Sequence, residues 1–136
     1  MMAATIPVVS PVDERVLNTY AISSQEQITQ KMAAARSAAS VWASYSVDKR
    51  VSLLSQLTAI ILTECDAITD LIVSVTGKVK TEVLLGEIYP VLELIRYYEK
   101  NAALILAPCR LTTSPLAFPN ASAQFERKPY GVVAVI

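Results

Sequence analysis

Apolar residues recur at steps of three and four over most of the chain, which is the period of an amphipathic helix. The first such segment runs from about residue 24 to residue 44 and is rich in alanine, a strong helix former. Either Ser23 with Glu26 or Ser24 with Gln27 has the spacing of a capping box at its start. The apolar positions on one face are Ile28, Met32, Ala35, Ala39 and Trp42.

A second helical region is predicted over about 47–76, starting near Ser46 or Asp48. One continuous apolar stripe follows it from Val51 to Val75, and Gly77 is typical of a helix C-terminus. Threonine and aspartate favour helix caps, so the segment 63–66 could divide this region into two helices.

A third helix is predicted over about 81–107, ending before Pro108. Its expected buried face holds Leu84, Ile88, Val91, Ile95, Tyr98, Ala102 and Ile105. Pro90 lies inside this helix, where its ring and its missing N–H conflict with the carbonyl of Gly86. We therefore expect a kink between Gly86 and Pro90, since glycine tolerates backbone distortion.

Strand signals lie at the two ends of the chain. Two apolar runs within 6–22 flank a Pro- and Asp-containing turn, which predicts a β-hairpin. Near the other end, 108–120 is predicted to be a surface loop and 122–128 a strand. The final run, 131–136, is apolar and β-branched, as in a strand buried within a parallel sheet. Such a strand needs a crossover to its neighbour, so we expect a continuation beyond it.

Composition narrows the classes of function. The chain has 136 residues, with 12 basic and 12 acidic side chains and a mean hydropathy of +0.41. This balance argues against a nucleic acid partner. Charges interrupt the most apolar region, so no membrane span is expected, and the N-terminus does not read as a secretory signal. We expect a cytoplasmic protein with apolar faces covered by other parts of a larger globule.

Residue types also limit the chemistry. The sequence contains no histidine, which excludes Ser-His-Asp and Cys-His catalysis within this chain and any histidine-based metal site. Cys65 and Cys109 lack metal-site spacing and are expected to be buried, reduced thiols, although Cys109 follows a helix end and could be exposed. No metal site is therefore expected.

The order of short motifs along the chain is more specific for one protein family than the helical pattern is. The chain resembles the N-terminal part of the NAD(P)-dependent aldehyde dehydrogenase superfamily over residues 6–136. The motifs that carry this resemblance are Ser10-Pro-Val-Asp-Glu14, Ala34-Ala-Arg36, Trp42, Lys49-Arg50, Thr76-Gly77-Lys78, Glu87, Arg96-Tyr97-Tyr98 and Pro129-Tyr-Gly-Val-Val133.

The resemblance implies an N-terminal fragment of an α/β aldehyde-dehydrogenase-like fold. Residues 1–121 would form the helical part of the cofactor-binding domain, mostly helical with the N-terminal β-hairpin. Residues 122–129 would belong to an oligomerisation arm that pairs with another subunit in a dimer or tetramer. Residues 130–136 would be the first strand of the Rossmann-like cofactor-binding sheet, truncated.

The resemblance also implies a reaction. Enzymes of this family oxidise an aldehyde to a carboxylic acid with NAD or NADP, through a cysteine thiohemiacetal that a glutamate-activated water releases. An asparagine helps to stabilise the oxyanion. None of these catalytic residues is expected in this chain, which should be inactive alone and depend on the remainder of the aldehyde dehydrogenase.

Three residues can be carried over from the family. Ile136 matches a strand-end residue that contacts the cofactor in the family. The alternative interpretation is that Ile136 is a core strand residue without a cofactor contact. Gly86 and Pro90 match the part of the third helix that lines the substrate entrance, where a glycine would leave room for a bulky aldehyde. The alternative interpretation of this pair is a helix irregularity with no role in substrate binding.

Two other functions remain open from the sequence. The runner-up is a non-catalytic helical interaction module derived from this segment. The third hypothesis is a protein that binds the membrane surface through an amphipathic helix. The lack of a Lys/Arg-rich polar face on the helices counts against it.

Overall fold

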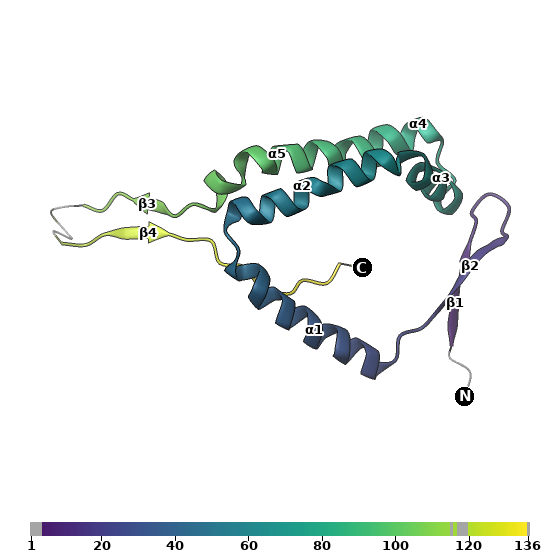
Figure 1. The fold of residues 1–136 in the computed structure, drawn as a ribbon, viewed down its shortest axis with the longest axis horizontal. Coiled ribbons are helices and arrows are strands. Elements are labelled where there is room, and N and C mark those ends of the chain that lie inside the picture. The colour runs from purple at the N-terminus through teal and green to yellow at the C-terminus, as the bar shows by residue number, and fades with distance from the viewer. Residues whose placement is uncertain (1–3, 115, 117–119, 136) are drawn as a thin grey trace.

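The computed structural model describes residues 4–114, 116 and 120–135, and it is mostly helical with two antiparallel strand pairs (Figure 1). The expected mostly helical fold is confirmed. In chain order the elements are β1 (Thr5–Val9), β2 (Val16–Ala21), α1 (Gln25–Ser44), α2 (Val47–Thr63), α3 (Cys65–Thr76), α4 (Lys80–Val83), the π-helical turn η1 (Leu84–Ile88), α5 (Tyr89–Leu106), β3 (Cys109–Leu111) and β4 (Ala123–Phe125).

The predicted N-terminal hairpin is confirmed. Strands β1 and β2 pair antiparallel, with Thr5 opposite Ala21 and an irregularity in register between Val8 and Val9. In the turn, the amide of Ser10 donates to the carbonyl of Arg15 at 2.9 Å. This bond closes the turn, and Ser10 is buried within it, which is unusual for a serine.

The predicted first helix is also confirmed, and its start decides between the two possible capping boxes. The amide of Gln27 donates to the Ser24 hydroxyl at 3.3 Å, and the Ser24 amide donates to Gln27 Oε1 at 2.8 Å. Ser24 is therefore the N-cap, and Ser23 lies outside the helix.

The second helical region divides at Glu64, within the segment where a break was considered possible. Gly77 then ends α3 in the left-handed conformation with φ of 74°. This is the conformation in which glycine is favoured at a helix C-terminus, because it has no Cβ to clash.

Helices α2 and α5 pack along each other and form one side of the open structure (Figure 1). Helices α3 and α4 lie at one end of this pair, next to the hairpin, and the β3–β4 ribbon projects beyond the other end. Helix α1 lies apart from the pair, and the segment 129–133 runs beside α1. Few side chains are fully enclosed in this open arrangement: the buried apolar residues are Val83, Ile88 and Ala102.

Several expected details differ in the structure. The segment predicted as the loop 108–120 begins with strand β3, because residues 109–111 pair with β4. Within the described residues, 131–135 form no strand, since no neighbouring segment offers a hydrogen-bonded ladder. The expected buried face of the third helix is buried only at Ile88 and Ala102, and exposed members alternate with them along the stripe. Its exposed members are Leu84, Val91 and Tyr98.

The two cysteines are free thiols, and Cys109 is exposed while Cys65 is half-buried. The expectation that both are buried is therefore wrong. Cys109 lies on the exposed β3–β4 ribbon, and Cys65 lies at the α2–α3 junction, where packing is incomplete. Among the residues that the structure describes, no helix combines the length and apolar character needed to cross a bilayer.

Candidate functional site

The most distinctive backbone feature is the π-helical turn η1, which interrupts the long helix between α4 and α5. The amide of Tyr89 donates to the carbonyl of Leu84, five residues back rather than four. Pro90 follows directly and lies in the first turn of α5, where a missing N–H leaves no helical bond unmade. The wide turn therefore accommodates Pro90 where a regular α-helix would place its ring against the Gly86 carbonyl.

The inner side of η1 is firmly packed. Val83 just before the turn is 0% exposed, and Ile88 within it is 7% exposed. Full burial of an aliphatic side chain of this size contributes about 1.5–3 kcal/mol. Ile88 also lines a pocket of about 250 Å³ between α2, α3 and the turn. The other side chains that line this pocket are Ile61, Ile68, Ile72, Glu87 and Val91.

The outer side of the same turn is open and apolar. Leu85 is 65% exposed and Tyr89 is 58% exposed, on either side of Gly86 in the sequence. A Cβ added to Gly86 would meet no heavy atom within 4 Å. The turn thus presents two large apolar side chains with an unfilled place at Gly86 between them in the sequence, which suits contact with an apolar molecule.

An ion pair lies at the edge of the turn. Lys78 Nζ is 2.5 Å from Glu87 Oε1, and the two side chains are 36% and 43% exposed. The hydrogen bond from Lys78 to Glu87, followed by the charge of Glu87, raises the pKa of Lys78 above its ordinary value. This pair connects Lys78, which follows the C-cap of α3, to Glu87 within η1.

The hairpin contacts the same region through Gly77. A Cβ added to Gly77 would lie 3.4 Å from Pro11 Cγ and 3.4 Å from Val12 Cγ2. The hairpin turn therefore packs against the α3 C-terminus, next to Lys78. Thr76 adds a local bond, because its hydroxyl accepts from the Lys78 amide at 3.3 Å.

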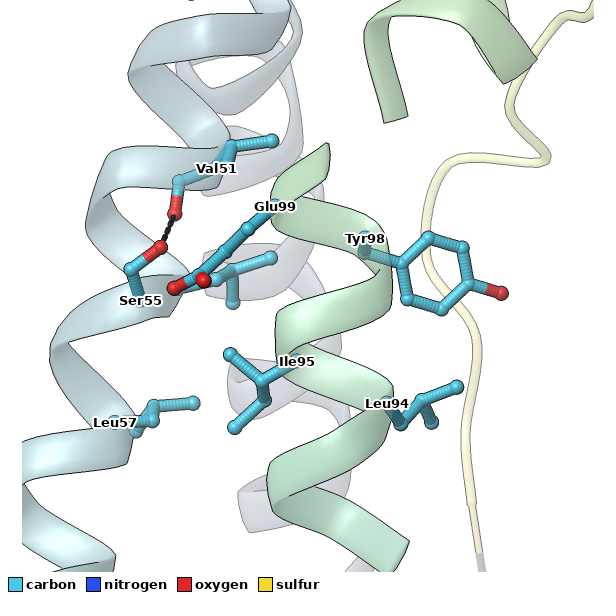
Figure 2. Close-up of a pocket in the computed structure, with 8 residues that line it drawn as sticks. Val51, Ser55, Leu57, Leu94, Ile95, Tyr98 and Glu99 are labelled. Carbon is cyan, nitrogen blue, oxygen red and sulfur yellow. Dashed lines mark hydrogen bonds between the residues drawn. The ribbon is translucent and has the colours of Figure 1, made fainter. Parts of the chain in front are cut away.

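A second pocket lies between α2 and α5, with a volume of about 160 Å³ (Figure 2). Ile95 points from α5 towards α2, and the Glu99 side chain extends towards Ser55. The Ser55 hydroxyl donates to the Val51 carbonyl at 2.9 Å and so is already used within its helix. This pocket is a packing seam between two helices rather than a reaction centre.

The described residues do not form a cradle for a dinucleotide. A Rossmann-type phosphate site needs a glycine-rich turn that leads from a strand into a helix N-terminus. Gly77 instead ends a helix, Gly86 lies within the π-turn, and Gly131 lies in a segment without regular structure. The described part of the chain therefore does not fit NAD or NADP by itself. Nor do the described residues contain a group of three or more acidic or cysteine side chains that could hold a metal ion.

The structure brings together two of the residues singled out from the sequence. Gly86 and Pro90 lie at one π-turn, so the expected irregularity between them is present as a widened helical turn. The expected cofactor contact, Ile136, lies outside the described residues. The pairing of Lys78 with Glu87 was not found from the sequence, since nine residues separate them and helical periodicity relates only positions three or four apart.

Comparison with known proteins gives a consistent result. The model of the aldehyde dehydrogenase family matches residues 2–136. The chain is 48% identical over 132 residues to the 4,4'-diapolycopene aldehyde oxidase of a Methylomonas species, covering 97% of this chain and 25% of that protein. The chain thus spans about a quarter of the length of this relative.

Solved structures share the fold at low sequence identity. The structure of Gox0499, studied for its cofactor and substrate selection, matches with a TM-score of 0.81 and 19% identity, covering 92% of this chain and 26% of that one. An NAD-dependent benzaldehyde dehydrogenase from Corynebacterium glutamicum matches with a TM-score of 0.72 and 14% identity, covering 82% of this chain and 24% of that one. These likenesses concern the fold, whereas the family match spans nearly the whole sequence. The chain belongs to the aldehyde dehydrogenase family.

Proposed function

We propose that this chain is the N-terminal part of an NAD(P)-dependent enzyme that oxidises a long, apolar aldehyde to a carboxylic acid. The observation that carries the proposal is the 48% identity, over 97% of the chain, to a diapolycopene aldehyde oxidase. Family membership supports aldehyde oxidation in general, and this relative suggests an extended apolar substrate.

In this proposal the chain contributes the wall of the substrate entrance. Leu85 and Tyr89 offer exposed apolar surface at the π-turn, and Gly86 leaves space for a chain of carbon atoms to pass. Gly86 and Pro90 are thus the proposed entrance residues. Burial of apolar substrate surface stabilises binding by about 25 cal/mol per Å².

The chemical step belongs to the remainder of the enzyme. The cysteine thiolate, the glutamate and the asparagine of the family reaction would come from segments outside this chain, and Ile136 would contact the cofactor only once they are in place. NAD or NADP would accept the hydride. The chain alone would bind the cofactor poorly and turn over no aldehyde.

We also propose that the β3–β4 ribbon belongs to an oligomerisation arm. β4 lies within residues 122–129, and the exposed Phe125 and Leu111 offer apolar surface to another subunit of a dimer or tetramer. Arg127 would fix the base of this arm, because its Nη1 donates to the Ile105 carbonyl at the end of α5. The proposed location of the enzyme is the cytoplasm.

The test is NAD(P)H formation by the enzyme that contains this chain. It should oxidise long alkyl and polyene aldehydes with higher kcat/KM than acetaldehyde or benzaldehyde. Turnover confined to the small aldehydes would contradict the apolar substrate, and absence of turnover with any aldehyde would contradict the enzyme itself. The 136-residue chain alone, assayed in parallel, should give no NAD(P)H.

The many exposed apolar side chains favour a second candidate, a non-catalytic interaction module. Leu62, Leu71 and Leu104 are examples on three different helices. A module of this kind would remain a well-behaved monomer by sedimentation and would bind a partner protein without any aldehyde dehydrogenase activity. Aggregation of the chain alone, relieved by co-expression with the rest of the enzyme, would favour the first proposal instead.

A further inference from the structure

We propose that the Lys78–Glu87 ion pair is a positioning element that holds the π-turn η1 in place and thereby sets how well long aldehydes bind. This inference rests on the proposed function in one respect only, namely that the outer side of η1 contacts the substrate. The positioning role itself rests on the contacts of the two residues.

The first argument is where the ion pair attaches. Lys78 follows Gly77, which the hairpin turn contacts through Pro11 and Val12. Glu87 lies within η1, one residue after Gly86. The pair is therefore a direct polar link between the α3 cap and the turn of the long helix that departs from α-helical hydrogen bonding.

The second argument is the surroundings of Glu87. Its side chain lines the pocket formed by aliphatic residues of α2, α3 and α5, including Ile72 and Val91. Charges beside apolar surface are less screened than charges in open water, so their attraction is stronger. The Glu87 side chain is still 43% exposed, so the attraction to Lys78 has the strength of a partly exposed ion pair rather than of a buried one.

The third argument comes from a neighbouring ion pair. Lys80 Nζ lies 2.6 Å from Asp70 Oδ1, but these side chains are 67% and 60% exposed. The pair joins α3 to α4 and does not reach η1. It therefore provides a control ion pair with the same charge types, whose lysine lies two residues after Lys78.

The consequence concerns the outer side of η1. Leu85 and Tyr89 are placed by the backbone of the turn, since neither is buried against the rest of the described structure. If the turn shifts register or frays, both side chains move with it. A molecule that spans them should be affected more than a small aldehyde that makes few contacts there.

The experiment uses the complete enzyme and two readouts. The first is hydrogen exchange of the amides in residues 84–89, measured by mass spectrometry. Glu87→Gln and Lys78→Met should each speed this exchange about two- to fivefold, the size expected for a partly exposed ion pair. Asp70→Asn should leave the exchange unchanged.

The second readout is the KM and kcat for a long alkyl aldehyde and for acetaldehyde. Glu87→Gln should raise the KM for the long aldehyde about two- to fivefold and leave kcat and the acetaldehyde KM nearly unchanged. The reversed pair, Lys78→Glu with Glu87→Lys, should restore at least half of the loss. It also guards against a Glu87→Gln protein that fails to fold.

The outcomes separate the two proposals. Equal exchange of residues 84–89 in Glu87→Gln and Asp70→Asn would overturn the positioning role, whatever the activity. A faster exchange together with an unchanged KM for the long aldehyde would overturn the link to substrate binding. A wild-type enzyme without activity on long aldehydes would contradict the proposed function, while the exchange readout would still decide the role of the ion pair.

Discussion

The amide of Tyr89 bonds to the carbonyl of Leu84, five residues back, as in the π-helical turn that precedes Pro90. In an α-helix the Tyr89 amide would bond to Leu85 instead, and residue 90 would bond to Gly86. Pro90 has no N–H for that bond, and its ring would clash with the Gly86 carbonyl in an α-helix. The wider turn avoids this clash. The same widening coincides with an open position at Gly86, which suits an entrance wall.

The glycines at 77 and 86 should respond in opposite ways to alanine. Gly77 has a φ of 74°, and its added Cβ would also touch Pro11 and Val12 at 3.4 Å. Gly77→Ala should therefore lower the free energy of unfolding by about 1–2 kcal/mol, the cost of the left-handed conformation for an L-residue.

Gly86→Ala is the matched substitution. Its Cβ meets no heavy atom within 4 Å, and alanine restricts the unfolded chain more than glycine does. We expect the free energy of unfolding to rise by about 0.5–1 kcal/mol, measured by urea denaturation. Loss of stability in this variant would show that the turn at residue 86 cannot accept a side chain.

A larger side chain at the same position should act on substrate choice. Gly86→Leu would fill the open space beside Gly86 that the proposed substrate would occupy. The ratio of kcat/KM for a long aldehyde over acetaldehyde should fall about tenfold, the scale at which hydrophobic pockets discriminate. An unchanged ratio would remove Gly86 from the substrate entrance, and Gly86→Ala is the control for any effect on the turn itself.

The helix start at Ser24 allows a direct test of capping. Its hydroxyl accepts from the Gln27 amide, so Ser24→Ala should lower the free energy of unfolding by about 1 kcal/mol. Ser23→Ala, one residue earlier, should change it by less than about 0.5 kcal/mol, as for other surface positions. Equal losses in the two variants would contradict the assignment of Ser24 as the N-cap.

Local chemistry made most of the elements predictable. The Ser24–Gln27 spacing, Gly77 and Pro108 mark helix ends, and the structure places ends next to each of them. Pro90 four residues after Gly86 predicted a disturbed helix, because the conflict between proline and the fourth carbonyl back is local. The type of disturbance, a π-turn, could not be predicted, because a kink and a widened turn both relieve that local conflict.

Features that depend on contacts between segments distant in the sequence could not be predicted. Strand β3 forms because Cys109–Leu111 pairs with a segment more than ten residues away, and three residues carry too little pattern to show it. The Lys78–Glu87 pair has the same origin, since the chain turns at Gly77 before the next helix begins. The sequence placed Ile28 on one apolar face of α1, and the structure leaves Ile28 exposed, because periodicity indicates which face is apolar but not what covers it.

The hairpin turn should respond to acid through Asp13. A hydrogen bond from the Ser10 hydroxyl, aided by the Arg15 amide and charge, lowers the pKa of Asp13 below its ordinary value. A carboxyl whose pKa is lower in the folded state stabilises the fold above its unfolded pKa of about 3.9, and this stabilisation is lost as pH falls through the folded pKa. Between about pH 5 and pH 2, unfolding of the wild type should therefore become progressively easier relative to Asp13→Asn.

The measurement is the urea midpoint as a function of pH for the wild type, Asp13→Asn and Ser10→Ala. Both variants should flatten the acid dependence, because one lacks the carboxyl and the other lacks its main hydrogen-bond donor. Glu14→Gln removes a charge from the next residue without removing the contact between Ser10 and Asp13. The urea midpoint of this variant should therefore fall with pH as steeply as that of the wild type over the range in which Asp13 titrates. If Glu14→Gln flattens the curve as much as Asp13→Asn does, the acid response reflects net charge in the turn rather than the bond between Ser10 and Asp13.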